Sequence, residues 1–194
     1  MAGCKSLSDE EVQKIKNSFV RQRDRTLFVL GIRTGWRISQ LLSIQLKHFI
    51  QHGQVSKTLK IDRTATKGQK TSQECALHSE AITELTKLVK DQYGNNFNSL
   101  NPDLYLFKSR KGINSPIKRA HVHNILKAIV NCLQLDGKIA SHSMRKTLSQ
   151  RIYKNSGNDL LITQKALNHS YISSTINYLD VNQKEVDKLI LDME

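Results

Sequence analysis

Five side chains in this sequence are of the types needed to attack a phosphodiester. Tyr178 supplies a phenol, and His169 precedes it by nine residues in A-L-N-H-S-Y-I-S-S-T-I-N-Y. His142 and Arg145, in H-S-M-R, lie 27 and 24 residues before His169, and Arg37 lies far upstream in T-G-W-R-I-S-Q-L-L. A phenol can form a covalent bond to phosphorus, while guanidinium and imidazole groups bind and protonate the phosphate. The set indicates covalent phosphoryl-transfer chemistry.

Each of these residues also has an ordinary structural interpretation. A solvated helix face, a histidine near a helix C-terminus and a core tyrosine with a hydrated hydroxyl would give the same letters. Asn168 favours a fixed His169, because asparagine often adopts the left-handed conformation that ends a helix. Arg37 follows a Thr-Gly turn with few acids nearby, which is typical of an anion-binding arginine. Lys67 begins a polar turn between two predicted strands; most turn lysines are only solvated.

The composition favours a polyanionic partner. Lys and Arg outnumber Asp and Glu by 30 to 17 in 194 residues, which gives a net charge of +13 and a sequence pI near 9.8. Nucleic acid is the usual partner of such a chain. No apolar run is long enough for a membrane span, and no signal peptide is recognisable. We therefore expect no membrane partner and a cytoplasmic location.

The cysteines and histidines indicate no metal centre. Cys4, Cys75 and Cys132 are odd in number and widely spaced, which is typical of reduced thiols in a cytosolic protein. His121-x-His123 is too isolated to count as a metal site. We expect no metal and no cofactor.

Apolar spacing and turn residues predict a chain that is mainly α with a small antiparallel β-sheet (α+β). A capping box at Ser8–Glu11 opens the first helix, and Ser115-Pro116 is predicted to open a long one. Ser79 is predicted to cap the helix between them. The remaining predicted helices span about 24–34, 36–46, 142–155, 159–168, 173–180 and 183–192, and the strands about 49–50, 55–61 and 72–77.

Four segments together resemble the tyrosine recombinases, also called the phage integrase family. T-G-W-R-I-S-Q-L-L is similar to T-G-[L/M]-R-I-S-E-L, and A-T-K-G-Q-K to a G-K-G-x-K hairpin. H-S-M-R-K is similar to H-x-L-R-H, and L-N-H-S-Y-I-S-S-T-I-N-Y to L-G-H-S-x-x-x-T-x-x-Y. Order and intervals agree over about residues 8–182, the span of a complete catalytic domain.

The departures from the family pattern spare the presumed catalytic groups. Gln40 replaces the usual acid, Trp36 the usual leucine and Asn168 the usual glycine, and Lys146 stands where a histidine is common. The larger departure is length, because most members carry an N-terminal core-binding domain. The resemblance implies either an excised domain or a short member similar to fimbrial phase-variation invertases.

The resemblance also implies a domain division. Residues 1–6 are expected to form a tail, 7–182 the catalytic domain, and 183–194 a C-terminal helix exchanged between protomers or covering its own core. No N-terminal core-binding domain is expected.

The implied activity is site-specific DNA strand exchange without metal or ATP. Tyr178 would attack the scissile phosphate and leave a 3′-phosphotyrosyl link, whose bond energy allows rejoining. Arg37 and Arg145 would clamp the non-bridging oxygens, and His169 would add a hydrogen bond.

Two residues are expected to handle protons. His142 would take the phenol proton or help to stabilise the phosphate. Lys67 would be the general acid for the departing 5′-hydroxyl.

The expected partner is double-stranded DNA, with self-association into a tetrameric synapse on nucleoid or mobile-element DNA. Lys118, Arg119 and His121, at the start of the predicted long helix, are candidates for groove contacts. Lys108, Arg110 and Lys111 form a basic loop expected nearer the DNA backbone. A type IB topoisomerase, a non-catalytic DNA-binding regulator and an RNA- or ribosome-associated protein remain alternatives.

Overall fold

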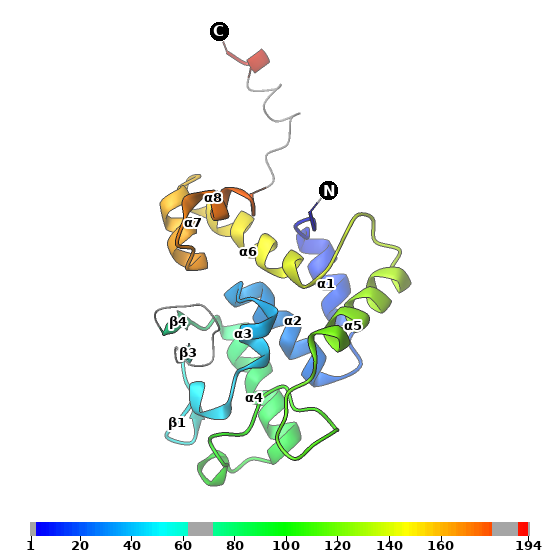
Figure 1. The fold of residues 1–194 in the computed structure, drawn as a ribbon, viewed down its shortest axis with the longest axis vertical. Coiled ribbons are helices and arrows are strands. Elements are labelled where there is room, and N and C mark those ends of the chain that lie inside the picture. Colours follow the sequence, from blue (N-terminus) through cyan, green and yellow to red (C-terminus); the bar gives the residue numbers. More distant parts are fainter. Residues whose placement is uncertain (1–2, 62–71, 180–189, 194) are drawn as a thin grey trace. The chain divides into compact units, whose positions relative to one another are not determined.

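The computed structural model describes residues 3–61, 72–179 and 190–193. The chain divides into two compact units, Met1–Leu148 and Ser149–Glu194, called unit 1 and unit 2 below. Helix α6 (Ser141–Asn155) begins in unit 1 and ends in unit 2. The fold is mainly helical with short antiparallel strands, as expected (Figure 1).

The helices and strands follow one another in a simple order. The other helices are α1 (Asp9–Asn17), α2 (Gln22–Thr34), α3 (Ile38–Leu42), α4 (Ser79–Tyr93), α5 (Arg119–Cys132), α7 (Leu160–Leu167) and α8 (Ile172–Ile176), with 3-10 turns at Leu46–His48 and Phe97–Ser99. The strands are β1 (Ile50–Gln51), β2 (Gln54–Val55), β3 (Thr58–Ile61) and β4 (Gln73–Ala76).

Within the described residues the strands form two separate two-stranded sheets. β1 pairs with β2 and β3 with β4, both antiparallel, and Ile61 lies opposite Gln73. The turn at His52-Gly53 was predicted and is confirmed, with both residues at positive φ. The predicted turn at Lys67-Gly68 and most of the predicted helix 183–192 lie outside the described residues.

Local signals placed several helix ends correctly. The capping box is confirmed: the Glu11 amide donates to the Ser8 hydroxyl, and the Ser8 amide donates to the Glu11 carboxylate. Gly35 ends α2 in the left-handed conformation, with φ of 62°. The predicted cap of α4 is wrong by one residue. The imidazole of His78, not the side chain of Ser79, accepts the Glu80 amide at the start of this helix.

The predicted helix opening at Ser115-Pro116 is wrong. This segment is extended and pairs with the chain before it: the Ser109 amide donates to the Ser115 carbonyl, and the Ile117 amide to the Phe107 carbonyl. Ile117 is buried by this pairing. Because the backbone is used there, α5 begins only at Arg119, with Lys118 as its N-cap.

The third helix is also shorter than predicted. It ends at Leu42 rather than near Leu46. The amide of Leu46 donates to the carbonyl of Leu104, and Gln45 forms an isolated bridge with Tyr105. Pairing with a distant segment therefore competes successfully with helix continuation.

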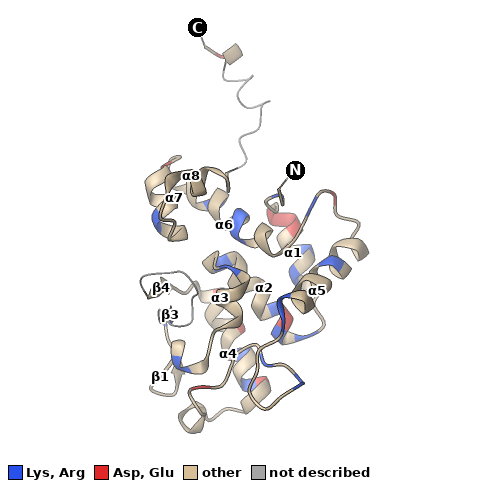
Figure 2. Ribbon diagram, viewed as in Figure 1, with Lys and Arg blue, Asp and Glu red and all other residues tan. Residues whose placement is uncertain are grey.

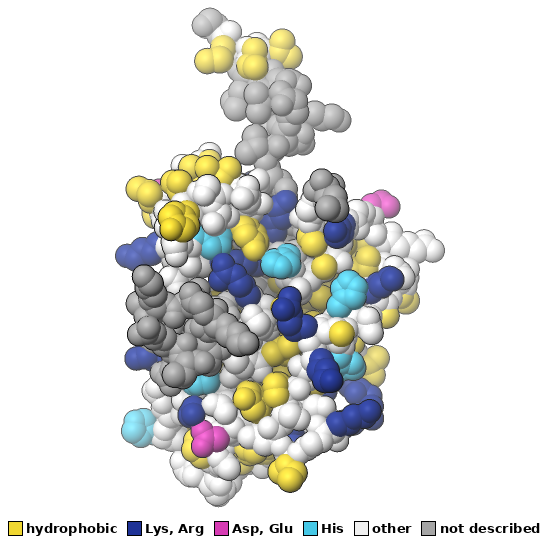
Figure 3. Space-filling view, in the orientation of Figure 1, with side chains coloured by type: hydrophobic (Ala, Val, Ile, Leu, Met, Phe, Trp, Pro, Cys, Tyr) yellow, Lys and Arg dark blue, Asp and Glu magenta, His cyan; other side chains and the backbone are white. Residues whose placement is uncertain are grey.

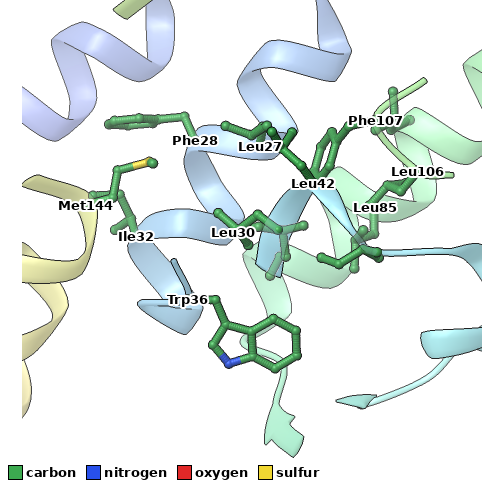
Figure 4. Packing of buried hydrophobic residues seen from close by; sticks show 14 of the residues in the cluster. Leu27, Phe28, Leu30, Ile32, Trp36, Leu42, Leu85, Leu106, Phe107 and Met144 are labelled. Carbon is green, nitrogen blue, oxygen red and sulfur yellow. The ribbon is translucent and has the colours of Figure 1, made fainter. Parts of the chain in front are cut away.

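The core of unit 1 surrounds α2, which is buried on nearly every side. Figure 4 shows Leu27, Phe28, Leu30 and Ile32 of this helix among residues from α3, α4 and the 106–107 segment. Met144 of α6 lies beside them and is 1% exposed.

Gly31 makes this approach of α6 possible. A Cβ added at Gly31 would lie 2.4 Å from the sulfur of Met144 and 3.2 Å from its Cβ. Interiors are close-packed, so a buried methionine has little room to withdraw. The glycine therefore sets how closely α6 can pack on α2.

Acidic residues of α4 connect it to α1 and α2. Glu80 forms ion pairs with Lys16 and Arg33, and Glu84 forms one with Arg25. Burial would raise the pKa of Glu80, but the hydrogen bonds from Lys16 and Arg33 prevail and hold it at about 2. These carboxylates therefore stabilise the packing of α4 against α1 and α2.

Unit 2 is a small helical unit in which α7 packs against α8. The carboxylate of Asp159 caps α7 by accepting the amides of Leu161 and Ile162. Ile172 and Ile176 of α8 are 41% and 47% exposed. Among the helices that the structure describes, none has the length and apolar character to cross a membrane.

We predict that Gly31→Ala destabilises the protein. Alanine should add about 1 kcal/mol of helix propensity, but overpacking against Met144 should cost about 1–3 kcal/mol. Chemical denaturation should show a net fall in the free energy of unfolding. Combining it with Met144→Ala should relieve the clash, so the double variant loses less than the sum of the single losses. A more stable Gly31→Ala protein would contradict this packing account.

Candidate active site

Arg37 stands at the N-cap of α3, immediately after the turn that ends α2. Its amide donates to the side-chain oxygen of Gln40 at 2.8 Å. The amide nitrogen of Gln40 in turn donates to Gln73, the first residue of β4. Both glutamines are buried. Gln40, which replaces the usual acid, thus still supports the backbone of Arg37 and ties it to the β3–β4 hairpin.

Arg145 is connected to the same turn. Its side chain is 1% exposed, and its Nη1 donates to the carbonyl of Gly35, two residues before Arg37. Gly35 and Arg145 are 110 positions apart in the sequence. A hydrogen bond from a buried guanidinium fixes its orientation and is strong because little water screens it.

His142 lies on the same helix as Arg145, three residues earlier, as predicted. Partial burial lowers its pKa from 6.5, and the positive charges of Arg145, Arg119 and Arg37 lower it further. An imidazole in this setting favours its neutral form, which can accept a proton. Unit 1 therefore brings Arg37, His142 and Arg145 into one electrostatic cluster.

In unit 2, Asn168 and Thr175 hold His169 from two sides. Asn168 ends α7 in the left-handed conformation, with φ of 50°, which confirms the prediction for this residue. The hydroxyl of Thr175 lies 3.0 Å from Nδ1 of His169, and both side chains are buried. A partner at Nδ1 orients the ring, so that Nε2 is the nitrogen that would act on a substrate.

Tyr178 is the tyrosine that contacts this histidine. The rings of His169 and Tyr178 have centroids 5.3 Å apart and planes inclined at 40°. Tyr178 lies in the turn just after α8, where its amide donates to the carbonyl of Thr175. Its rival Tyr171 is the N-cap of α8 and is 73% exposed. Within unit 2, Tyr178 thus packs against His169, whereas Tyr171 is largely exposed.

The residues predicted to contact DNA lie in unit 1, before α5 and in its first turn. Two hollows open there. One, of about 790 Å³, is lined by residues that include Arg21, Lys108 and Arg110. The other, of about 540 Å³, lies between α3 and the start of α5 and includes Lys118 and Arg119. Figure 2 shows the Lys and Arg positions along this part of the chain.

These cations are not neutralised by nearby acids. Across residues 3–61, 72–179 and 190–193, no ion pair includes any of the predicted DNA-contact residues Lys108, Arg110, Lys111, Lys118 and Arg119. Figure 3 shows Lys, Arg and His side chains grouped on one face with few acidic ones among them. Such a face suits a polyanion.

One predicted site residue, Lys67, lies outside the described residues. Three supporting residues were not singled out from the sequence: Thr175, Gln73 and Arg23. The family box contains a threonine between its histidine and its tyrosine, which was a signal for Thr175. Nothing local indicated Gln73 or Arg23, whose partners lie 33 and 98 residues away.

Comparisons with known proteins point to one family. The model of the phage integrase family matches residues 5–185. The probable integrase/recombinase YoeC of Bacillus subtilis (strain 168) is 29% identical over 178 residues, covering 90% of this chain and 87% of YoeC. The tyrosine recombinase XerD of Staphylococcus saprophyticus is 25% identical over 174 residues, covering 86% of this chain and 53% of XerD.

A solved structure shares the fold. The XerH site-specific recombinase, bound to a palindromic difH substrate in a post-cleavage complex, matches with a TM-score of 0.72 and 22% identity. The match covers 97% of this chain and 53% of the XerH chain. The present chain thus spans about half the length of XerD and of XerH.

The electrostatic cluster in unit 1 predicts how His142 titrates. In the protein without DNA, its midpoint in an NMR pH titration should lie below 6.5, and Arg119→Gln should raise it because one neighbouring cation is removed. Arg110→Gln serves as a matched control and should leave the midpoint unchanged. Because the folded-state pKa is lowered, this group's contribution to stability is present above pH 6.5 and is lost as pH falls below it. A midpoint above 6.5 would contradict the cluster.

Proposed function

Because this chain belongs to the phage integrase family, we propose that it acts as the catalytic domain of a tyrosine recombinase, cutting and rejoining DNA at specific sites. One observation carries the proposal beyond family membership. The positive charges of Arg37 and Arg145 lower the pKa of His142, although Arg37 lies over a hundred residues away in sequence. Folding therefore gathers residues that the sequence supplies from two separate boxes.

The proposed reaction is a transesterification. The phenolic oxygen of Tyr178 attacks the scissile phosphorus, and the bond from phosphorus to the 5′-oxygen breaks. His142 accepts the phenol proton, and Lys67 gives a proton to the 5′-oxygen. The product is a 3′-phosphotyrosyl bond and a 5′-hydroxyl. Attack by the 5′-hydroxyl of a partner strand reverses these steps, so no external energy source is consumed.

The arginines would bind the phosphate as negative charge develops. Arg37 and Arg145 each present a planar fork that suits two phosphate oxygens. His169, oriented by Thr175, would donate from Nε2 to the same group. Each fixed donor is worth a factor of about 10²–10³ in rate. The neutral form of His142 fits a proton acceptor better than a phosphate-binding cation.

Double-stranded DNA is the proposed substrate. The net charge of +13, the two hollows and the cations at 108–119, which form no ion pair within the described residues, support this choice. Lys108, Arg110 and Lys111 would contact the backbone, and Lys118, Arg119 and His121 the groove. Binding of this kind should weaken steeply as salt rises, because phosphate contacts release counterions.

Strand exchange between two duplexes cuts four strands, so a tetramer on DNA is the proposed assembly. The described C-terminal residues Ile190, Leu191 and Met193 are 61%, 83% and 79% exposed. Apolar side chains this exposed at a chain end suit docking against another protomer. A type IB topoisomerase would instead relax supercoiled DNA as a monomer, and a non-catalytic DNA-binding regulator would form no covalent bond to DNA.

We predict that Tyr178→Phe abolishes the covalent protein–DNA adduct while DNA binding persists. Only the nucleophilic oxygen is lost, so phosphate contacts remain. A suicide substrate carrying a nick next to the cleavage site traps the adduct, which can be counted on a denaturing gel. Tyr171→Phe is the matched control and should still form it. An adduct peptide containing Tyr171, or a linked Tyr178→Phe protein, would reassign the nucleophile.

We predict that Lys67→Ala cleaves ordinary DNA slowly but cleaves a 5′-bridging phosphorothiolate at close to the wild-type rate. Sulfur departs without a proton, so a missing general acid no longer matters. Lys70→Ala, three residues away in the same segment, is the control and should behave alike on both substrates. Rescue of Lys70→Ala instead would transfer the role to Lys70.

A further inference from the structure

A buried arginine joins α2 to the two basic segments near α5. Arg23 is 9% exposed and pairs with its neighbour Asp24, Nε to Oδ1 at 2.8 Å. Its Nη1 donates to the carbonyl of Lys108 at 3.2 Å, and its Nη2 lies 3.0 Å from Nε2 of His121. All three branches of the guanidinium are thus used.

The contact between Arg23 and His121 determines the protonation of the imidazole. A guanidinium has donors only, so the ring nitrogen facing it must accept. Nε2 of His121 then carries a lone pair, and the proton of the ring lies on Nδ1. A doubly protonated ring could not make this hydrogen bond.

His121 lies among cations at the start of α5. His121 is the third residue of α5, where the helix dipole is positive, and it follows the cations Lys118 and Arg119. Asp24 balances the charge of Arg23, which allows the guanidinium to lie beside a neutral imidazole. The side chain of His121 is nonetheless exposed.

We propose that Arg23 is a specificity-determining residue that acts through His121. Its hydrogen bond holds the ring as the neutral tautomer with the proton on Nδ1, so that His121 offers DNA a single hydrogen-bond donor rather than a charge. This rests on the proposed function, since it requires the first turn of α5 to lie against DNA.

The chemistry defines the kind of base that His121 reads. A donor in the major groove suits purine N7, guanine O6 or thymine O4, and it is opposed by the amino group of cytosine. A phosphate would be bound better by a cation and would carry no sequence information. The proposal therefore assigns His121 to base reading and predicts that cytosine is disfavoured at one position.

The test compares the sequences that variants select from a pool of randomised DNA duplexes. Asparagine can place its side-chain NH₂ near the position of Nδ1, whereas leucine has a similar size and no donor. His121→Asn should keep the wild-type preference, and His121→Leu should lose it at one base pair, from about tenfold towards none. The same changes at His123, two residues along α5, are the matched controls and should leave that position unchanged.

Arg23→Gln should lose the preference at the same base pair as His121→Leu. Arg25→Gln, which removes an arginine of α2 bound to Glu84 and to the carbonyl of Lys16, should not. Should Arg23→Gln fail to fold, the two His121 variants still decide the question. A purely structural role for Arg23 would alter stability and overall affinity without altering which base is selected.

A measurement without DNA separates this inference from the proposed function. Nitrogen NMR of the wild-type protein should show His121 with a protonated Nδ1 and an unprotonated Nε2. A proton on Nε2, or a His121→Leu protein with unchanged preference at every position, would overturn the inference. A wild-type protein that selects no sequence at all would instead contradict site-specific recombination.

Discussion

The hydrogen bond from Arg145 to the carbonyl of Gly35 is the contact on which the arrangement of unit 1 depends. Gly35 ends α2 in a conformation that glycine adopts without strain, and Arg37 follows two residues later. Met144 brings α6 to this point by packing over Gly31. One buried hydrogen bond thus sets the distance between two arginines that the chain supplies from separate helices.

Acidic and basic side chains have different roles in this protein. Glu80 and Glu84 of α4 form ion pairs that connect this helix to α1 and α2. Lys108, Arg110, Lys111, Lys118 and Arg119 form no ion pair with an acid in the part of the chain that the structure describes. Arg23 is the exception in this region, because Asp24 balances it. Where acids pair with cations inside the fold, the remaining cations leave a positive surface, which suits a polyanion.

Predictions from sequence succeeded where the deciding contact is local. The Ser8–Glu11 capping box and the left-handed Gly35 and Asn168 depend on groups within about four residues. They failed at Ser115-Pro116, where the backbone pairs with the segment just before it, and at the end of α3, where it pairs with a distant segment at Leu104–Tyr105. A hydrogen bond to another segment satisfies a backbone group as well as a helical one does, and no local sequence pattern predicts it.

The sequence by itself determined the types and order of the reactive side chains, the positive charge and the turns that precede Arg37 and His169. Only the tertiary structure decided the environment of those side chains. The lowered pKa of His142, the partner at Nδ1 of His169 and the contact of Arg23 with His121 arise from folding. Hydrogen bonds need donor and acceptor within about 3.5 Å, and salt screens charges beyond about 10 Å, so both effects depend on which residues folding brings together.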